Sequence, residues 1–432
     1  MIGNNKLSKK SFAIYGLGIT GRSVINFFKR LNIKNYYAWD DSLKKRKYYN
    51  IRSNLNNFKY VLNKSDFIVV SPGINLKEVK LKKYLKKNKS KVITDLDLFY
   101  MANPNHKSIA VTGTNGKSTT CKIIEHLLKK NKRDVKIGGN IGKPILNLKL
   151  KKNSIVIIEA SSFQLAHSKF VEPDYAILLN ISKDHLDWHY SMQNYINSKF
   201  RIFNLQSKKS FAFLGKKNLI NKFKRKKYLS NLIIVSKNSY NKVKDKINNS
   251  YLNFGANNEN MPYVYALSKI LKIKERNFLN AFNNFKGLPH RNEIVLKKKN
   301  LIFINDSKAT SFEACKITLK KNSNIYWILG GKPKTGDKFY LDHIKKNVIR
   351  AYIIGQNTKF FSKKLKNKIK YKITKTLKVA LKKIFIDVKN DSTKKSVVLF
   401  SPASASFDQY KNFNERGEAF KKLVKIYANK QL

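Results

Sequence analysis

The residues best suited to chemistry in this chain stand together in one segment, VTGTNGKSTT, at positions 111–120. An apolar run precedes the turn, which ends in Gly116, Lys117, Ser118 and Thr119. Glycines allow successive backbone N–H groups to converge on phosphate oxygens, a lysine reaches the terminal phosphates, and a hydroxyl can ligate Mg²⁺ at the start of a helix. The segment therefore predicts a site for ATP or GTP, with a helix over CKIIEHLLKK directly after it.

This loop departs from its usual form, because Val111 stands where a glycine is expected and the loop is shorter. An ordinary glycine-rich turn is the alternative. The apolar strand before the turn and the helical pattern after it favour the phosphate site.

Two further side chains could act beside a phosphate-bound metal. Glu159 ends the apolar run SIVIIE, where a carboxylate could ligate Mg²⁺, or it could instead cap a helix over ASSFQL. His185 and His189 are four residues apart, as in a zinc site, but the glutamate of H-E-x-x-H is missing. We therefore expect His185 to be a neighbour of Mg²⁺ or phosphate, or else a structural histidine.

A second glycine-rich turn lies near the N-terminus, in SFAIYGLGITGRSVINFFKR. Gly16-x-Gly18-x-x-Gly21 follows an apolar strand and precedes a helical pattern, as in dinucleotide-binding turns. The next strand, NYYAWDD, ends near Asp40, where an acid could bond a ribose hydroxyl, and the strand DFIVVSPGI stops at Ser71. On these residues alone the ligand could be NAD, a UDP group or nothing.

Alternating strands and helices must position these residues. Apolar runs alternate with helical patterns in three blocks, and the third block contains LIFIND, IYWILGG, AYIIG and VVLFSPAS. This alternation indicates buried parallel sheets. We expect an α/β protein with domains at residues 1–95, 96–287 and 288–432.

Composition excludes several classes of protein. The 432 residues are 42% hydrophobic, which indicates a globular chain, and no stretch approaches the roughly 20 apolar residues that span a bilayer. The net charge of +64 comes mostly from lysines spread from end to end, whereas nucleic-acid readers gather arginine and aromatic residues in one patch. We therefore expect a cytoplasmic protein with no nucleic-acid partner and no membrane partner. We also expect a monomer.

Eight segments occur in the order seen in the Mur ligases, and the chain resembles this family from Gly16 to Phe420. The resemblance implies a Rossmann-like N-terminal domain, a central domain like the P-loop ATPases, and a Rossmann-like C-terminal domain. The segments are VTGTNGKSTT, GGNIGKP, EASSFQL, NISKDHLDWH, GLPHRNE, NDSKATS, LGGKPKTGD and SPASASFDQYKNFNERGEAF.

Three segments separate the branches of the family. GLGITG, NDSKATS and SPASASFDQYKNF resemble the branch that adds D-glutamate to UDP-N-acetylmuramoyl-L-alanine, whereas sister ligases show a pattern like D-Y-A-H-x-P in place of NDSKAT. The resemblance implies an ATP-dependent ligase of peptidoglycan synthesis. The substrate carboxylate would attack the γ-phosphate, and the amine of glutamate would then displace phosphate from the acyl phosphate.

The resemblance also implies residue roles. Lys117, Glu159, His185 and Lys199 would be catalytic, and two Mg²⁺ ions would be served by Ser118, Glu159, His185 and Lys199. Lys199 would be carbamylated, which turns a cation into an anionic oxygen ligand. ATP would be bound by Gly113, Thr114, Asn115, Gly116, Lys117, Ser118, Thr119, Asn257, Asn260, Arg291, Asp306 and Lys308.

The remaining implied roles concern the other two substrates. The UDP-linked substrate would be held by Gly18, Ile19, Thr20, Asp40, Ser71, Gly73 and Asn140. The incoming D-glutamate would be bound by Thr310, Lys334, Ser406 and Phe413.

The chain departs from the family at H-N-x-x-N, which here is ANNEN at residues 256–260. The histidine is lost, so we expect altered nucleotide affinity.

Other functions stay open: a different Mur ligase or a folylpolyglutamate synthase, a nicotinamide-dependent oxidoreductase, and a nucleic-acid-binding P-loop ATPase. The oxidoreductase leaves the phosphate loop unexplained, and the ATPase leaves GLPHRNE and SPASASFDQYKNF unexplained.

Overall fold

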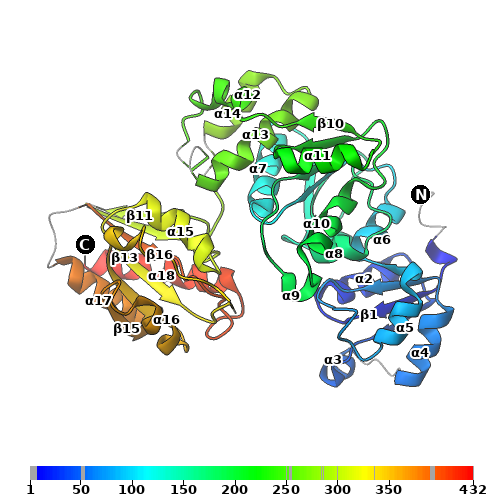
Figure 1. Cartoon of the computed structure of the whole chain (residues 1–432), viewed down its shortest axis with the longest axis horizontal. Coiled ribbons are helices and arrows are strands. Elements are labelled where there is room, and N and C mark those ends of the chain that lie inside the picture. Colours follow the sequence, from blue (N-terminus) through cyan, green and yellow to red (C-terminus); the bar gives the residue numbers. More distant parts are fainter. Residues whose placement is uncertain are drawn as a thin grey trace. The chain divides into compact units, whose positions relative to one another are not determined.

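The computed structural model describes residues 7–49, 54–249, 251–252, 255–283, 285, 287–298, 300–334, 336–389 and 395–431. Contacts between residues divide the chain into two units, Met1–Phe285 and Lys286–Leu432 (Figure 1). The first unit contains two parallel sheets and the second contains one mixed sheet.

The N-terminal sheet has the strand order β2-β1-β3-β4 and parallel pairings. The order reverses between β1 and β3, and ligands of open α/β sheets bind outside the carboxyl ends of strands at such a point. Helix α2 buries Val24, Phe27 and Phe28, because residues three and four apart share one helix face. The elements are β1 (Phe12–Tyr15), α2 (Ile19–Arg30), β2 (Tyr36–Trp39), α3 (Leu43–Tyr48), α4 (Leu55–Lys64), β3 (Phe67–Val70), α5 (Lys82–Lys87), η1 (Lys89–Lys91) and β4 (Val92–Ile93).

The second sheet has the order β10-β9-β8-β5-β7-β6, again with parallel pairings. Strand β5 lies between β7 and β8, so the turns after these three strands meet at one edge. The elements are α6 (Asp95–Ala102), β5 (Ser108–Thr112), α7 (Lys117–Lys130), β6 (Val135–Gly139), η2 (Ile145–Asn147), β7 (Ile155–Glu159), α8 (Ser162–His167), β8 (Tyr175–Leu178), α9 (Leu186–His189), α10 (Met192–Phe200), η3 (Arg201–Phe203), β9 (Phe211–Leu214), α11 (Lys217–Arg225), β10 (Asn231–Ile234), α12 (Lys237–Lys244), α13 (Gly255–Ile270) and α14 (Glu275–Asn283).

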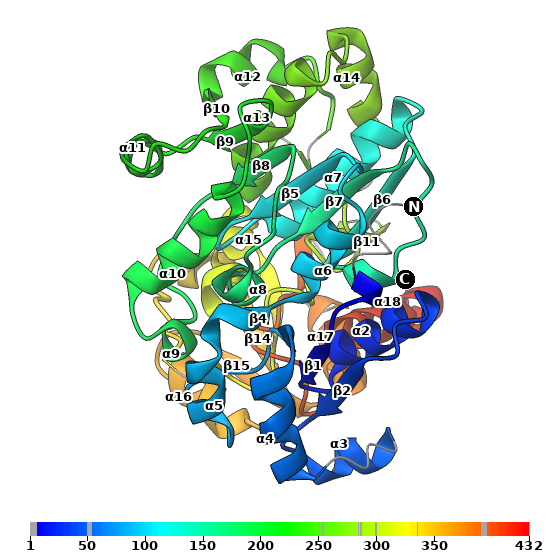
Figure 2. The ribbon, with the colours of Figure 1, turned by 90° about the vertical axis from the view of Figure 1, so that its right-hand side faces the viewer.

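One hydrophobic cluster joins these two sheets. It includes Phe12 and Ile14 of β1, Leu96 and Phe99 of α6, and Ala110 of β5, each at most 2% exposed. Figure 2 shows the strands of both sheets within this unit, the first in blue and the second in cyan to green. Because their cores are continuous, the turns of the two sheets are held by one packed body.

The sheet of the second unit has the order β11-β12-β16-β13-β14-β15 and is parallel except for β11. The sequence predicted four of these strands and missed β11 and β15. Both lie at the edges of the sheet and keep many side chains partly exposed, so their hydrophobic pattern is weak. The elements are β11 (Glu293–Lys298), β12 (Leu301–Asn305), α15 (Phe312–Lys321), β13 (Ile325–Gly330), η4 (Lys345–Asn347), β14 (Val348–Ile354), α16 (Thr358–Leu365), β15 (Tyr371–Lys375), α17 (Leu377–Lys389), β16 (Ser396–Phe400) and α18 (Phe413–Gln431).

These three sheets confirm the expected α/β fold class, and α7 follows the phosphate loop directly, as predicted. The domain ends expected at residues 95 and 287 stay a prediction. Among the described helices, none has the length and apolar character needed to cross a membrane.

Candidate active site

Helix α7 begins at the phosphate loop without a side-chain cap. Gly116 is its N-cap residue, and its φ of 86° lies in the left-handed region that favours glycine. A Cβ at this position would lie 2.4 Å from Oδ1 of Asn260, so a larger residue would clash. Because the cap residue supplies no acceptor, the first N–H groups of α7 can bind an anion such as phosphate.

Two lysine ammonium groups meet at one carbonyl oxygen of this loop. Lys117 donates from Nζ to the carbonyl oxygens of Gly113 and Thr114, both at 2.8 Å. Lys199 of α10 donates from Nζ to the same Gly113 oxygen at 2.7 Å. Lys199 is 1% exposed, and burial, together with the charge of Lys117, holds the pKa of Lys199 well below its usual value. A lysine with a lowered pKa can be uncharged near neutral pH and can then react as a nucleophile.

Asn180 fastens the phosphate loop from the turn after β8, and the sequence analysis did not single it out. Its carbonyl oxygen accepts from the backbone N–H of Thr114 at 3.0 Å, and its Oδ1 accepts from that of Asn115 at 2.9 Å. The Thr114 hydroxyl lies 3.0 Å from that of Tyr195. The position of Asn180 in NISKDH, directly after an apolar strand, is the signal that could have found it.

Glu159 ends β7 beside this loop and is 2% exposed. Asn140 donates from Nδ2 to Oε1 of Glu159 at 2.8 Å, whereas Oε2 has no hydrogen-bond partner among the described residues. A buried carboxylate oxygen without a donor is costly unless a cation completes it. The alternative of a helix cap is wrong, because Ser161 and Gln164 form the capping box of α8.

His185 occupies the N-cap position of α9 and has a φ of 51°. Its Nε2 lies 3.3 Å from Oδ2 of Asp184, and its ring centre lies 4.7 Å from that of Phe163. His189 is engaged elsewhere, since its buried Nε2 lies 3.0 Å from the Ser162 hydroxyl. In the part of the chain that the structure describes, no three His, Cys, Asp or Glu side chains group as a metal site. A metal beside His185 would therefore need further oxygen ligands.

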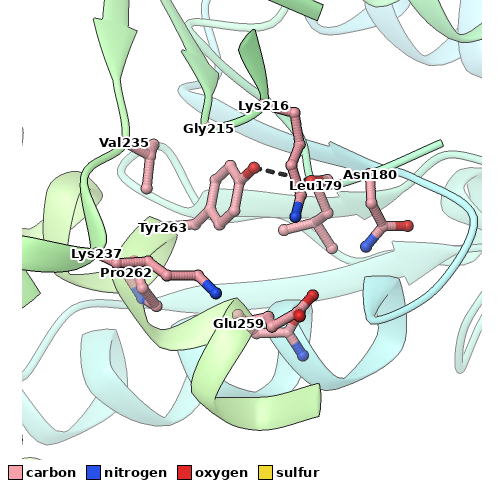
Figure 3. Close-up of a pocket in the computed structure, with 10 residues that line it drawn as sticks. Leu179, Asn180, Gly215, Lys216, Val235, Lys237, Glu259, Pro262 and Tyr263 are labelled. Atoms are coloured by element: carbon pink, nitrogen blue, oxygen red, sulfur yellow. Dashed lines mark hydrogen bonds between the residues drawn. The ribbon is translucent and has the colours of Figure 1, made fainter. Parts of the chain in front are cut away.

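A pocket adjoins the phosphate loop at the ends of β8, β9 and β10 (Figure 3). Tyr263 of α13 lines it and donates from its hydroxyl to the carbonyl oxygen of Leu179 at 2.8 Å. Lys216, Lys237 and Glu259 contribute charged groups, and the remaining lining residues are Asn180, Gly215, Val235, Asn260 and Pro262. The pocket thus combines an aromatic ring and apolar side chains with hydrogen-bonding groups.

Of the two asparagines expected near the nucleotide, Asn260 lines this pocket. Asn260 is also next to Gly116, so it lies at both the pocket and the phosphate loop. Asn257 donates from Nδ2 to the carbonyl oxygen of Tyr251 at 2.9 Å, close to the start of α13. A nucleotide contact for Asn257 stays a prediction.

The turns after β1 and β3 are tied together at the switch point of the N-terminal sheet. Ser71 donates from Oγ to the carbonyl oxygen of Gly16 at 2.8 Å. Asp40, which is 4% exposed, accepts from the backbone N–H groups of Leu17 at 2.8 Å and Ser42 at 2.9 Å. Asp40 therefore shapes the glycine turn, and its contact with a substrate stays a prediction.

The tip of that turn leaves room beside its backbone. A Cβ on Gly18 would meet no atom within 4 Å, and neither would one on Gly73. Ile19 is 80% exposed, and Thr20 is half-buried. By contrast, a Cβ on Gly21 would lie 1.8 Å from the carbonyl oxygen of Gly16, so Gly21 is needed for packing.

In the second unit, Arg416 of α18 holds two loops together. It is 1% exposed and donates to the carbonyl oxygens of Ser307 at 2.8 Å and Ser404 at 2.9 Å. The Ser307 hydroxyl donates in turn to the carbonyl oxygen of Phe413 at 2.8 Å. The loops after β12 and β16 are therefore fastened to the start of α18. The sequence analysis missed Arg416, although it lies in one of the quoted segments.

The residues expected at the glutamate lie on these loops and on the loop after β13. Thr310 and Lys334 are exposed, Ser406 is 2% exposed, and Phe413 begins α18. The Nζ of Lys308 lies 3.7 Å from the centre of the Phe413 ring. Lys308 was expected near ATP, and here it contacts a residue expected near glutamate.

Asp306 is buried behind the same loops. Its Oδ2 accepts from the Ser401 hydroxyl at 2.9 Å, and its Oδ1 accepts from the backbone N–H of Asn292 at 3.2 Å. Burial raises the pKa of Asp306 to about 6. Asp306 thus anchors the segment that carries the half-buried Arg291, and nucleotide contacts for these two residues stay predictions.

Comparisons with known proteins identify a family for this chain. The family model "Mur ligase middle domain" matches residues 111–278, and "Mur ligase MurD-like, N-terminal domain" matches residues 10–93. UDP-N-acetylmuramoylalanine–D-glutamate ligase of Rickettsia felis is 36% identical, with 98% of this chain and 99% of that protein covered. The chain belongs to the Mur ligase family. A relative of the same name from Aquifex aeolicus is 35% identical, with 96% of this Mur ligase and 99% of the relative covered.

Solved structures share the fold of this Mur ligase. MurF ligase from Thermotoga maritima, solved in complex with ADP, has a TM-score of 0.58 at 18% identity and covers 98% of this chain and 99% of its own. UDP-N-acetylmuramate-alanine ligase from the same organism has a TM-score of 0.55 at 16% identity, and the match covers 98% of this chain and 100% of that one. The structure therefore confirms the fold implied by the resemblance.

Proposed function

We propose that this chain is an ATP-dependent ligase that joins D-glutamate to UDP-N-acetylmuramoyl-L-alanine in peptidoglycan synthesis. The observation that carries the proposal is the meeting of Lys117 and Lys199 at the Gly113 carbonyl oxygen, in a chain similar over nearly its whole length to ligases named for this reaction. A nicotinamide-dependent oxidoreductase would have no use for this phosphate loop.

ATP would lie across the phosphate loop and the neighbouring pocket. The N–H groups at the start of α7 and the Lys117 ammonium suit the triphosphate. Tyr263 and Leu179 offer apolar surface to the base, and Asn260 lies where the pocket meets the loop. This continuity supports the ATP assignment, because a nucleotide needs both parts at one place.

Glu159 and Ser118 fit a Mg²⁺ ion bound to phosphate. Oε2 of Glu159, which has no hydrogen-bond partner among the residues described, would supply the carboxylate oxygen, and Ser118 lies in the first turn of α7. The metal would supply positive charge to oxygens that become more negative during phosphoryl transfer. Lys117 adds a fixed cation on the same side.

Lys199 and His185 would serve a second Mg²⁺ once Lys199 is carbamylated. An uncharged lysine amine attacks CO₂, the new N–C bond forms, and the nitrogen loses a proton to give an anionic carbamate. The lowered pKa of Lys199 favours the uncharged amine that this step needs. The carbamate would provide oxygen ligands that His, Asp and Glu side chains of the described residues do not assemble.

The two other substrates would approach the reacting phosphate from different loops. The turns at Gly16 and Ser71 suit the UDP group, and Asn140 would face the sugar from beside Glu159. The loops fastened by Arg416 would hold glutamate. The substrate carboxylate would take the γ-phosphate, and the glutamate amine would then displace phosphate to form the amide.

Phosphate release tests this proposal. The purified protein is incubated with ATP, Mg²⁺ and UDP-N-acetylmuramoyl-L-alanine, and D-glutamate, L-glutamate and meso-diaminopimelate are compared as the third substrate. We expect release only with D-glutamate. Release with meso-diaminopimelate alone would assign the chain to a sister reaction, and no release with any amine would reject the ligase.

We further propose that the enzyme acts as a monomer in the cytoplasm, where ATP and UDP-linked sugars are available. Light scattering should give a mass near the chain mass of 50.1 kDa, with and without substrates. A mass near twice that value would reject the monomer.

A further inference from the structure

Tyr190, directly after α9, adopts a backbone conformation that is unusual for its residue type. Its φ is 63° and its ψ is −23°, in the left-handed region that a bulky side chain rarely adopts. The side chain is 46% exposed, so core packing does not account for this conformation. Contacts outside the core must offset the strain.

Those contacts come from the loop between β3 and α5 in the N-terminal sheet. The Tyr190 hydroxyl donates to Oε1 of Glu78 at 2.9 Å and accepts from Nδ2 of Asn75 at 2.8 Å. Asn75 also donates to the same Glu78 oxygen at 2.8 Å, which closes a triangle of hydrogen bonds. The Nζ of Lys77 lies 3.9 Å from the ring centre, within the range of a cation–π interaction.

Short turns connect each side of this contact to the candidate site. On the N-terminal side, the N–H of Ile74 donates to the Ser71 carbonyl oxygen at 2.9 Å. In the next turn, the N–H of Glu78 donates to the Asn75 carbonyl oxygen at 3.0 Å. On the other side, the N–H of Tyr190 donates to the Leu186 carbonyl oxygen at 2.8 Å, one residue after His185. Figure 2 shows α9 next to the N-terminal part of this unit.

We propose that Tyr190 is a positioning residue that locks the loop after β3 onto α9. The proposal rests on the proposed function, because it assumes that Ser71 lies at the UDP group and His185 near the reacting carboxylate. One substrate molecule would then span both sides of the lock. The lock fixes the distance between the part of the protein that binds the UDP group and the part that binds the reacting carboxylate. The carboxylate then reaches the phosphate when the UDP group is bound.

Substitution of the hydroxyl tests the lock directly. Tyr190→Phe removes both hydrogen bonds of the hydroxyl and keeps the ring, and Tyr48→Phe is the matched control because Tyr48 is 73% exposed on α3. We expect Tyr190→Phe to weaken binding of UDP-N-acetylmuramoyl-L-alanine, measured by calorimetry without ATP, by about fivefold. The KM for ATP should stay within about twofold of wild type. Equal substrate affinity in Tyr190→Phe and wild type would overturn the lock.

A second variant separates positioning from stability. Tyr190→Asn keeps a residue that tolerates the left-handed region, so its Tm should not fall, while its affinity for the UDP-linked substrate should fall as in Tyr190→Phe. A lower Tm with unchanged affinity would make Tyr190 a structural residue and overturn the proposal.

A double substitution tests whether Tyr190 acts through its partner. Glu78→Ala alone should weaken substrate binding, and adding it to Tyr190→Phe should cause little further loss, because both remove the hydrogen bond between Tyr190 and Glu78. If the double variant loses affinity for the UDP-linked substrate by the full product of the two single losses, Tyr190 and Glu78 act independently and the pairing is overturned. If the wild-type protein does not bind the UDP-linked substrate, the proposed function and the lock fail together, whereas wild-type binding that Tyr190→Phe does not change removes the lock alone.

Discussion

Lys117 and Lys199 donate hydrogen bonds to the same oxygen atom, the backbone carbonyl of Gly113, at 2.8 Å and 2.7 Å. Burial holds the pKa of Lys199 well below its usual value, and the charge of Lys117 lowers this pKa further because two cations that share one acceptor repel each other. Lys117 is therefore suited to remain a cation at the phosphates, and Lys199 is suited to be modified.

Removal of the Lys117 charge should stop turnover. At the proposed ATP site this ammonium would oppose charge that develops during phosphoryl transfer, and the loss of one such group costs about 10²-fold or more in kcat. We expect this loss in Lys117→Ala, and none in Lys130→Ala at the exposed end of the same helix. Initial-rate assays of phosphate release check it, and turnover within about threefold of wild type would remove Lys117 from the ATP site.

If Lys199 is carbamylated as we propose, activity should depend on bicarbonate. The uncharged amine is the reactive form, so at limiting bicarbonate the active fraction should rise with pH as more Lys199 loses its proton. Lys199→Ala should be nearly inactive and partly restored by a short-chain carboxylate, which replaces the missing oxygen ligand. Mass spectrometry under CO₂ trapping should find the added group on wild type, and a fully active alanine variant would make Lys199 an ordinary buried lysine.

The glycines of the N-terminal turn should separate binding from folding. A Cβ on Gly18 meets no atom within 4 Å, so Gly18→Val should leave Tm unchanged and weaken binding of the UDP-linked substrate by blocking approach to the backbone. Gly21→Val would press against the Gly16 carbonyl oxygen and should unfold the turn. Thermal melts and substrate titration check both. Stoichiometric NADH binding by wild type would instead favour the oxidoreductase.

Burial of Asp95 gives the first unit a pH-dependent stability. Burial raises the pKa of Asp95 to about 6, whereas its ordinary value is 3.8, so the native state binds more protons between these values. The stability that Asp95 contributes is present at low pH and is lost as the pH rises through about 6. Asp95→Asn should therefore raise Tm at pH 7.5 relative to wild type and flatten the change in Tm between pH 4.5 and 7.5, because Gln164 still finds an acceptor.

Asp66 is the control, because its pKa is shifted in the opposite direction to that of Asp95. Hydrogen bonds from the backbone and hydroxyl of Ser11 lower the pKa of Asp66 to about 2, so its stability is present near neutral pH and lost only on strong acidification. Asp66→Asn should lower Tm at pH 7.5. Equal effects of the two asparagine variants would contradict the assignment for Asp95.

The sequence predicted best those features of the site that residues close together in the chain form. The phosphate loop, the strand end at Glu159 and the glycine turn are local patterns, and each lies where it was expected. Arg416 acts through Ser307, 109 residues away, and Tyr190 through Asn75, 115 residues away. Such contacts depend on how strands are ordered in a sheet, which periodicity does not encode.

The last prediction concerns the amino acid site that we propose in the second unit. Lys334 is exposed on the loop after β13, where its ammonium can meet a carboxylate of the incoming D-glutamate. A charge-assisted contact of this kind contributes about 1.5–3 kcal/mol. Lys334→Ala should therefore raise the KM for D-glutamate by roughly tenfold or more, and leave the KM values for ATP and the UDP-linked substrate within about threefold.

The control is Lys338→Ala, an exposed lysine four residues further along the same loop, which should change none of the three KM values. Ser406→Ala should act in the same direction as Lys334→Ala but more weakly, because a neutral hydroxyl contact contributes less than a charged one. The pattern across the three substrates decides the assignment more than the size of any one effect. If both variants weaken ATP binding and spare glutamate, the third substrate does not bind at these loops, and the argument for D-glutamate addition over the sister reactions loses its structural support.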